Sequence, residues 1–309
     1  MGTTFPTSPA GSAEPMPARS GSPDGRARYV FLLPAVAYLL LLGIVPLVFS
    51  LYLVFSSWQG GQGIRWVGLA NIRTLLADER FWGALKTTLL YVLGVGVVEL
   101  VVGFLVALAI QNATWGKNLL RGSLALPLML TPIAVAFTWK MLFDYNKGPL
   151  NFFLASLGLP RVAWLAGQRS ALVSIGLVDV WQWTPFIIIA ALAALESLPT
   201  EIYEAATVDG ASSWNVLTHI TLPLIQPYLV AIVLLRAIDA FKVFDTIYIL
   251  TGGGPGTATE MLTFYAYVAG FRPFNMGFTS TVSWALVIIM TVVFLVYLRV
   301  FRRIEQEGT

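Results

Sequence analysis

Residues 204–223 read EAATVDGASSWNVLTHITLP, a polar stretch without Lys or Arg that stands between two long apolar runs. Thr200 can cap a short helix that carries Glu204 in its early turns, where the positive end of the helix favours a carboxylate. Gly210 stands where a residue in the left-handed region would end that helix. A short acidic helix followed by a sharp turn is therefore predicted between two apolar segments.

A second short helix is predicted after this turn. Ser212 or Ser213 can cap it, and Pro223 is expected to stop it. Ala205 and Ala206 keep one face of the first helix thin, so that another surface can approach its backbone closely. The pair of helices fits a protrusion that docks into a groove on another protein, and the alternative is a re-entrant or interfacial hairpin with no partner.

The composition indicates a membrane protein. The 309 residues are 57% hydrophobic and 11% charged, whereas about 25% of the residues in soluble domains are charged. A helix needs about 20 mostly apolar residues to cross the hydrocarbon of a bilayer. Tyr29 to Phe55 gives 27 uncharged residues and Pro273 to Leu298 gives 26. The predicted fold class is an all-α polytopic membrane protein.

Apolar runs predict six transmembrane helices, at 29–55, 85–111, 119–142, 171–195, 225–250 and 276–301. Pro127 and Pro132 are expected to kink the third span. Pro, Gly, Ser and Ala dominate residues 1–28, which are predicted to be a disordered cytoplasmic tail. The predicted organisation is completed by a six-helix domain over 29–303, which contains the segment 196–223, and by a short tail at 304–309.

Both ends of the chain are predicted to be cytoplasmic, with the loops at 56–84, 143–170 and 251–275 on the outer side. Lys and Arg number eight on each side in this arrangement, so a raw count does not decide between the two orientations. The basic residues just before the first span and the RVFRR cluster at 299–303 favour the inner side for both ends.

Residues 204–223 also carry a family resemblance. The pattern E-A-A, three residues, G, nine residues, I-x-L-P resembles the EAA signature of permease subunits in binding-protein-dependent ABC importers. The resemblance implies the type I permease fold with a cytoplasmic coupling helix between spans four and five, which docks in a cleft of the ATP-hydrolysing subunit. It implies these ATPase-coupling residues: Glu204, Ala205, Ala206, Asp209, Gly210, Ile220, Leu222 and Pro223.

The likeness extends over about 29–301. The stretches FDTIYILTGGGPGTATE (244–260) and DVWQWTPF (179–186) are similar to the carbohydrate branch, in particular to the maltose- and glycerol-phosphate-type first permease. The resemblance implies that the chain forms half of a translocation pathway for a carbohydrate, in a bacterial or archaeal plasma membrane. The implied partners are a second homologous permease subunit, two ATP-binding subunits and an extracytoplasmic solute-binding protein, and no nucleic acid is expected.

The residues themselves argue against an enzyme. The chain has no Cys and one His, which excludes thiolate chemistry and a His-rich metal site. The GGGPG stretch at 252–256 is followed by Thr257, Ala258 and Thr259 and not by the Lys of a phosphate-binding loop, so it is predicted to be an extracytoplasmic turn. No cofactor is expected in this chain, and the resemblance assigns ATP and Mg²⁺ to a partner ATPase.

Four charged residues of the fifth span, Arg236, Asp239, Lys242 and Asp245, alternate in sign at three-residue spacing. Charges inside a membrane are costly unless paired or hydrated. They are expected either to neutralise one another along one helix or to line a substrate pathway, and an ion-gradient-driven secondary transporter that uses them is the alternative function. Aromatic side chains that could stack on sugars, or pack ordinarily, are Trp181, Trp183, Phe186, Phe241 and Phe244. Glu99 and Asp179 are predicted to be hydrogen-bond partners between helices.

Overall fold

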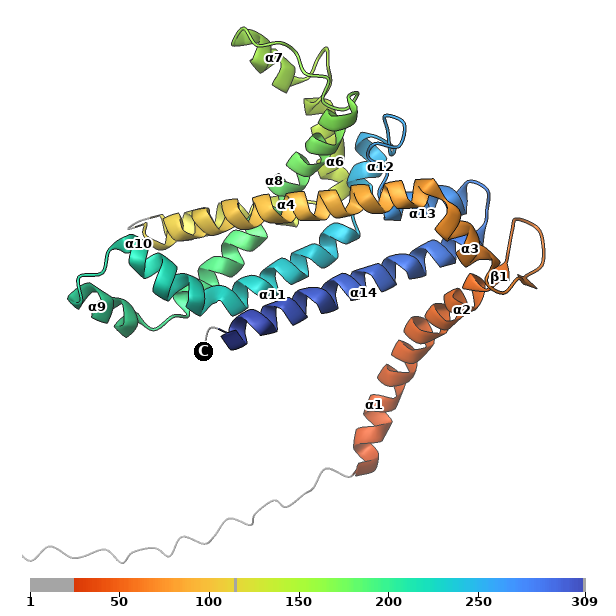
Figure 1. Ribbon diagram of the computed structural model, residues 1–309, viewed down its shortest axis with the longest axis horizontal. Coiled ribbons are helices and arrows are strands. Elements are labelled where there is room, and N and C mark those ends of the chain that lie inside the picture. Colours follow the sequence, from red (N-terminus) through yellow and green to blue (C-terminus); the bar gives the residue numbers. More distant parts are fainter. Residues whose placement is uncertain (1–24, 114–115, 308–309) are drawn as a thin grey trace, which may run out of the picture. The chain divides into compact units, whose positions relative to one another are not determined.

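The computed structural model describes residues 25–113 and 116–307, and most of the chain is helical (Figure 1). The described residues divide into two compact units, with the boundary between Phe49 and Ser50. Five of the described helices are long and apolar enough to cross a membrane, or six if one bent pair counts as a single span. The prediction of an all-α membrane protein is thus confirmed at the level of five to six apolar helices.

The α-helices are α1 (Gly25–Leu39), α2 (Val45–Val54), α3 (Ala70–Ala77), α4 (Glu79–Gln111), α5 (Lys117–Met129), α6 (Pro132–Leu142), α7 (Pro149–Ser156), α8 (Gln168–Glu196), α9 (Thr200–Val208), α10 (Ser213–Val216), α11 (Leu222–Phe241), α12 (Asp245–Leu250), α13 (Leu262–Phe271) and α14 (Met276–Glu307). Two turns of π-helix, η1 (Leu40–Ile44) and η2 (Leu217–Thr221), join α1 to α2 and α10 to α11. One antiparallel hairpin pairs β1 (Ser56–Ser57) with β2 (Arg65–Trp66).

The first unit holds α1, η1 and the start of α2. The helix begins at Gly25, four residues before the predicted start of the first span, and the candidate span within it is Leu32–Val54. Its side chains are mostly Leu, Val and other apolar residues, as a lipid-facing helix requires. Residues 1–24 of the predicted disordered tail lie outside the described residues.

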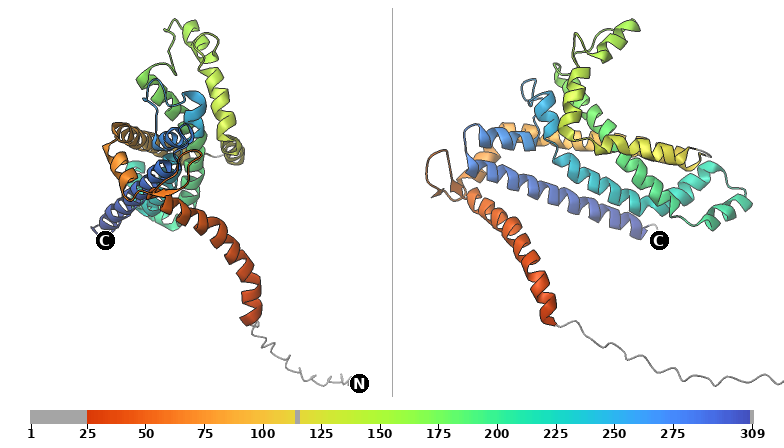
Figure 2. Two further views of the ribbon diagram at one scale, coloured as in Figure 1. Left: turned by 90° about the vertical axis from the view of Figure 1, so that its right-hand side faces the viewer. Right: turned by 180° about the vertical axis from the view of Figure 1, so that it is seen from behind.

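In the second unit, α11 lies between α4 and α14 (Figure 1), and it contacts both of them. α8 packs along α4 more extensively than any other helix does. Figure 1 and the right-hand view of Figure 2 place α9 and α10 at one end of this bundle and α3 at the other end. The polar segment around α9 is therefore separated from α3 by the length of the bundle.

The close packing of α4 on α8 depends on Gly103. A Cβ atom at this position would lie 2.7 Å from Cγ2 of Ile187 and 2.9 Å from its Cβ, closer than side-chain atoms can approach. A glycine in a helix costs about 1 kcal/mol relative to alanine, and here it lets the backbone of α4 approach α8 closely at Ile187. α4 carries the buried Glu99 and α8 carries the buried Asp179, so this close approach also holds the helices of these two acids together.

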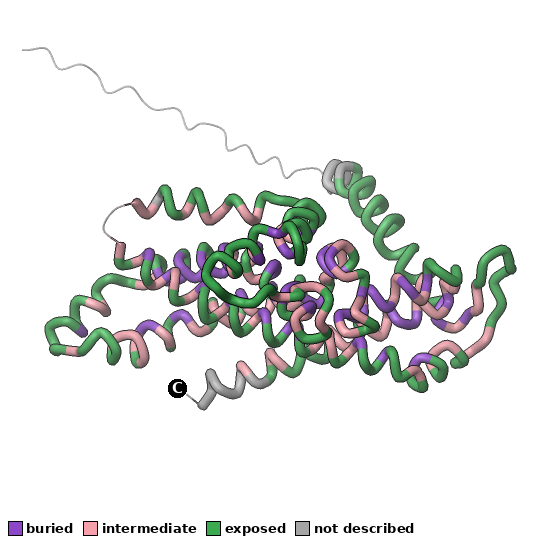
Figure 3. The backbone as a smooth tube through the Cα atoms, turned by 90° about the horizontal axis from the view of Figure 1, so that it is seen from above, coloured by how far each residue is buried: buried purple, intermediate pink, exposed green. Residues whose placement is uncertain are grey.

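Three hydrophobic clusters form the core of the second unit. The central cluster includes Val95, Ile175 and Phe241, while a second cluster near α9 includes Ala107 and Ile225. The third cluster joins α3, α4, α13 and α14, and it includes Leu75, Phe81, Leu262 and Val282. Figure 3 shows buried positions alternating with exposed ones along the helices. The helices thus bury one face against each other and leave another apolar face exposed, as expected for a bundle in lipid.

The predicted third span is broken into two helices rather than kinked within one. Leu119–Met129 and Pro132–Leu142 meet at 93°. Pro127 lies within α5, and the break falls at Leu130 and Thr131, both of which have extended backbones. The residue before a proline is driven out of the helical region, so Pro132 accounts for the position of the break. The prediction that the prolines disturb this span is confirmed.

The predicted fifth span, 225–250, is wrong at both ends. The helix starts upstream, at Ser213, and ends at Phe241, and α12 forms a separate helix after it. At the break, the Thr263 hydroxyl donates to the Val243 carbonyl at 2.5 Å. This side chain comes from α13, so the break is stabilised by a partner distant in sequence rather than by a local stop signal.

The remaining differences concern loops and the C-terminus. The predicted loop at 56–84 contains the hairpin and α3, and the loop at 143–170 contains α7. Residues 252–256 form a turn as predicted, with three of its glycines at positive φ. α14 continues to Glu307, so residues 304–307 of the predicted C-terminal tail are helical.

Candidate functional site

The E-A-A stretch forms α9, which ends in a tight turn at Gly210. This residue has a φ of +73°, and open space surrounds the position of its missing Cβ, so the backbone conformation alone favours glycine. The Ala211 amide donates to the Ala206 carbonyl at 2.9 Å, and the Gly210 amide donates to the Thr207 carbonyl at 3.1 Å. These two bonds make a Schellman motif, and the predicted role of Gly210 in ending the helix is confirmed.

The predicted N-terminal cap of α9 is wrong. Thr200 is the first residue of the helix, and Pro199 occupies the cap position without a capping side chain. After the turn, the Ser212 hydroxyl accepts a hydrogen bond from the Asn215 amide at 3.3 Å and caps α10. Of the two serines considered as caps, the structure therefore selects Ser212.

Pro223 does not stop the second helix, contrary to the prediction. The chain runs from α10 through η2 into α11 without a break, and Pro223 lies in the first turn of α11. A proline ring normally clashes with the carbonyl four residues earlier. In the π turn the Leu222 amide bonds instead to the Leu217 carbonyl, and this wider turn accommodates the ring. The polar segment is therefore one end of the helix Ser213–Phe241.

Most of the predicted coupling residues on α9 and its turn are open to the surroundings. Glu204, Ala205, Asp209 and Gly210 are exposed, whereas Ala206 is buried. The predicted thin face therefore exists at Ala205 only, because the next residue is turned inward by the helical rotation. α9 thus presents acidic and small side chains outward.

A hydrogen bond between side chains connects α9 to the start of α11. The Tyr203 hydroxyl lies 3.2 Å from the Thr221 hydroxyl. Thr221 is buried and stands between Ile220 and Leu222, which are half-buried, whereas Pro223 is exposed. The E-A-A and I-x-L-P residues are thus close together at one end of the bundle. Thr221, the x of I-x-L-P, bonds to Tyr203 and so joins α9 to the start of α11.

A second group of polar side chains is buried between α4, α8 and α11. Arg236 of α11 is 2% exposed, and its Nη2 donates to Glu99 of α4 at 2.9 Å and to Asp179 of α8. Its Nε lies 2.7 Å from the other Glu99 oxygen. The guanidinium carbon also lies 5.5 Å from the centre of the Trp183 ring, in a cation–π contact. Glu99 and Asp179 therefore join helices by hydrogen bonding, as predicted.

The predicted neutralisation of the four span-five charges by one another is only partly right. Lys242 pairs with Asp239 at 3.0 Å, and both side chains are about half exposed. Arg236 turns away from this pair to the acids of α4 and α8. Asp245 is the first residue of α12, beyond the helix break, so it does not share a helix with the other three.

The predicted aromatic residues lie in different surroundings. Phe241 is buried in the central cluster, and Phe244 packs in a group of rings with Tyr248, Phe264 and Tyr267. Phe186 and Trp183 are half-buried, whereas Trp181 is 42% exposed and makes an edge contact with Trp139. Packing thus accounts for the two phenylalanines of the 241–244 region, and Trp181 is the aromatic residue of this set with the most open ring.

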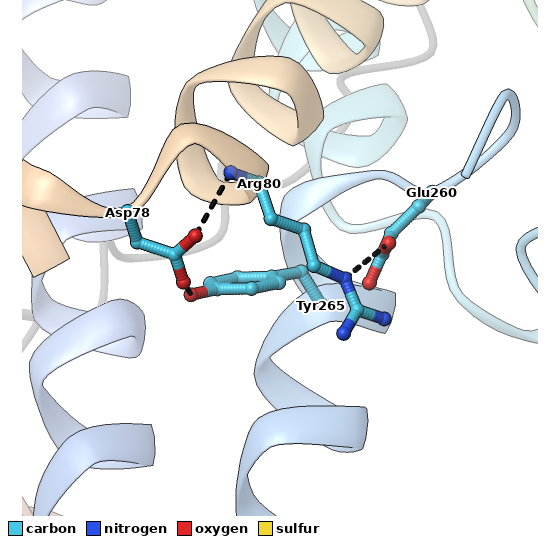
Figure 4. Close-up of polar contacts among 4 residues, drawn as sticks. All are labelled: Asp78, Arg80, Glu260 and Tyr265. Carbon is cyan, nitrogen blue, oxygen red and sulfur yellow. Dashed lines mark hydrogen bonds and ion pairs between the residues drawn. The ribbon is translucent and has the colours of Figure 1, made fainter. Parts of the chain in front are cut away.

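A third polar group lies where α4 begins (Figure 4). Arg80 pairs with the buried Glu260 through its Nε at 2.8 Å and lies over the Tyr265 ring, and the Tyr265 hydroxyl donates to Asp78 at 2.5 Å. Burial raises the pKa of Tyr265 well above its ordinary value, and the hydrogen bond to Asp78 adds to this effect. This network joins the loop that follows the GGGPG turn to the first turn of α4.

Sequence reasoning did not predict the partners within either polar group. Glu99 and Asp179 stand out in the sequence as single acids within apolar runs, but no neighbouring residue or spacing indicates that Arg236 is their partner. Arg80 and Glu260 are 180 positions apart. Among residues 25–113 and 116–307, no group of three or more His, Asp or Glu side chains could hold a metal ion.

Comparison with known proteins agrees with this architecture. Residues 99–307 match the model of a family described as the inner membrane component of binding-protein-dependent transport systems. The chain is 37% identical to a probable ABC transporter permease protein, y4oQ, of Sinorhizobium fredii over 84% of each chain. It is 34% identical to the trehalose/maltose transport system permease protein MalF of Thermococcus litoralis, over 88% of this chain and 93% of that one.

A solved structure shares the fold over nearly the whole chain. A chain from the crystal structure of a bacterial ABC transporter involved in the import of the acidic polysaccharide alginate matches with a TM-score of 0.80 and 25% identity. The match covers 90% of this chain and 96% of that one. It therefore extends beyond the residues matched by the family model to most of the helices that precede residue 99.

Proposed function

This chain belongs to the family of inner membrane components of binding-protein-dependent transport systems, and on that premise we propose that it forms half of the translocation pathway of an ATP-driven carbohydrate importer. The solute is a sugar, an oligosaccharide or a polyol-type compound. The kinship with permeases supports a transport subunit that is not itself an enzyme. The alternative of an ion-gradient-driven secondary transporter receives no support from these relatives.

One observation carries the coupling role, namely the exposed acidic α9 at the end of the bundle. α9 is closed by a Schellman turn and tied by Tyr203 to a helix that runs to Phe241. A load applied to α9 by a docked ATPase subunit would therefore reach the centre of the membrane through one continuous helix. Glu204 is the proposed polar contact with the ATPase, and Gly210 shapes the protrusion.

The proposed substrate class rests on the kinds of solute that the relatives carry, together with the side chains that remain open. Trp181 offers an exposed ring face for stacking, and Asp239 and Lys242 offer half-exposed charged groups for hydroxyls. Phe241 is buried and Arg236 is fully engaged with two acids. We therefore place the sugar-contacting role on Trp181, Asp239 and Lys242.

The proposed assembly has two permease subunits, two ATP-binding subunits and an extracytoplasmic solute-binding protein. ATP and Mg²⁺ belong to the ATP-binding subunits, and the N- and C-termini of this chain lie in the cytoplasm of a bacterium or archaeon. If α8 spans the membrane, α7 and α9 must lie on opposite sides, because α7 precedes the first residue of α8 and α9 follows its last residue. This requirement makes the orientation testable within one molecule.

The absence of cysteine from the chain allows a clean experiment. We expect Val208→Cys, at a position that is 88% exposed on α9, to react with a membrane-impermeant maleimide only after the inner face of the membrane is opened. Phe152→Cys, at a position that is 77% exposed on α7, is the matched control and should react in intact cells. Reaction of Val208→Cys in intact cells would overturn the coupling role.

The energy source is tested separately in proteoliposomes that contain the whole complex, with maltose and trehalose as probes. Uptake should require ATP and should survive a protonophore. Crosslinking of Val208→Cys to an ATPase subunit should block it. Uptake that is abolished by the protonophore at constant ATP would refute the ATP-driven mechanism.

A further inference from the structure

The Arg236 cluster contains two carboxyl groups and a single guanidinium. Glu99 and Asp179 approach Arg236 from two different helices, and both accept a hydrogen bond from the same nitrogen, Nη2. If both acids were ionised, the cluster would carry one uncompensated negative charge. Within the described part of the chain, no other Lys, Arg or His nitrogen lies within 4.0 Å of either carboxyl group.

The surroundings of the cluster offer little to stabilise this extra charge. Among the described residues that line a cavity of about 200 Å³ between α4, α11 and α14, Arg236 is the one charged residue, and the others are almost all apolar. The hydroxyl of Tyr91 on α4 lies beside the two acids, and Tyr297 on α14 lines the same cavity as Arg236. Both are neutral phenols at physiological pH, so neither supplies a positive charge.

Two carboxylates that share one donor in a water-poor site repel each other, and such pairs are relieved when one group keeps its proton. That proton also turns one oxygen into a donor, so the repulsion is replaced by a hydrogen bond. A proton held in this way belongs to the pair and not to either residue alone.

We propose that Glu99 and Asp179 bind one proton between them, so that the cluster with Arg236 is electrically neutral inside the membrane. The proton is structural: it balances the charge of the three helices α4, α8 and α11 and is not transported. The proposal depends neither on the identity of the solute nor on the partner subunits. It goes beyond the transport role and stands or falls on its own measurement.

Infrared spectroscopy reads this proton directly, because a protonated carboxyl group absorbs at a different frequency from a carboxylate. The protein is purified with the subunits that it retains, in a maltoside detergent, since lipid esters absorb in the same region as a protonated acid. The wild type at neutral pH should show a band from one protonated acid in the difference spectra against Glu99→Gln and against Asp179→Asn. Either amide leaves one carboxylate for one guanidinium, so each should abolish the band.

Two further variants sharpen the test. Arg236→Gln removes the cation, so both acids should become protonated and the band should about double. Glu260→Gln is the matched control, because Glu260 is also buried but has Arg80 to itself, and this change should leave the band unaltered. If Arg236→Gln fails to fold, the wild type and the two amides still decide the question. The absence of a protonated-acid band in the wild type, or its persistence in both amides, would overturn the proposal.

Thermal unfolding of the same proteins gives an independent check. Each single amide preserves a neutral cluster and should unfold close to the wild-type temperature. The double variant Glu99→Gln/Asp179→Asn leaves Arg236 buried without an anionic partner and should unfold at a clearly lower temperature. Equal unfolding temperatures for the single and double variants would contradict the charge balance.

Discussion

The hydroxyl groups of Tyr203 and Thr221 lie 3.2 Å apart and join α9 to the residue that precedes α11. Within the described residues, this is the one hydrogen bond between a side chain of α9 and a side chain of residues 220–223, which carry the I-x-L-P part of the pattern. It spans the turn that Gly210 and Ala211 make. The position of α9 on the end of the long helix therefore depends on a tyrosine that lies just before the E-A-A residues.

Removing this bond should loosen α9 without unfolding the bundle. We expect Tyr203→Phe to lower stability by about 1 kcal/mol, the usual net value of one hydrogen bond, and to reduce the solute carried per ATP hydrolysed. Thr221→Val should have the same effect, and the double variant should be no worse than either single variant, because both remove one shared interaction. Thermal unfolding and coupled uptake measurements check this, and strictly additive losses would show that the two residues act separately.

The turn at Gly210 should be sensitive to backbone conformation and not to side-chain volume. Gly210→Pro fixes φ at about −65° and removes the N–H that donates to the Thr207 carbonyl, so the observed φ of +73° becomes inaccessible. We expect normal membrane abundance with ATP hydrolysis largely uncoupled from uptake. Gly210→Asn is the control, since asparagine tolerates the left-handed region and open space surrounds this position. Wild-type uptake by the proline variant would contradict the role of the turn.

Asn151 holds the loop that contains α7. Its amide nitrogen donates to the carbonyls of Tyr145 and Val162, and its oxygen accepts from the Val162 amide and from the Trp164 indole, at 3.0–3.3 Å. Asn151→Leu should remove about 1 kcal/mol of local stability for each bond and expose residues 145–164 to protease. Asn146→Ala, at an exposed neighbouring position, should leave the cleavage rate unchanged. Equal cleavage rates would show that Asn151 does not anchor the loop.

Tyr265 should give the protein a stability change at alkaline pH. Its pKa in the folded protein is raised above the ordinary value by burial and by Asp78. Its contribution is fully present below the unfolded-state pKa of about 10 and is lost as the pH rises toward the higher folded-state value. Unfolding temperatures measured upward from neutral pH should therefore fall in this alkaline range. Tyr265→Phe should flatten that part of the profile, and an unchanged slope would argue against the assignment.

The sequence alone determined the features that depend on neighbouring residues. Long uncharged runs predicted the apolar helices, because a helix needs about 20 mostly apolar residues to cross the hydrocarbon. Gly210 predicted the end of α9, because few other residues adopt a positive φ. The same local reasoning failed at Pro223, where the π turn η2 accommodates a ring that an ordinary helix would reject.

Only the tertiary structure decided which charges meet. Arg236 is three residues from Asp239, yet it pairs with Asp179 and Glu99, which are 57 and 137 positions away. The Val243 carbonyl, at the break after α11, likewise accepts its hydrogen bond from Thr263, 20 positions further along the chain. Burial makes an unpaired charge or carbonyl costly, and the packing of distant helices determines which group is within reach to satisfy it.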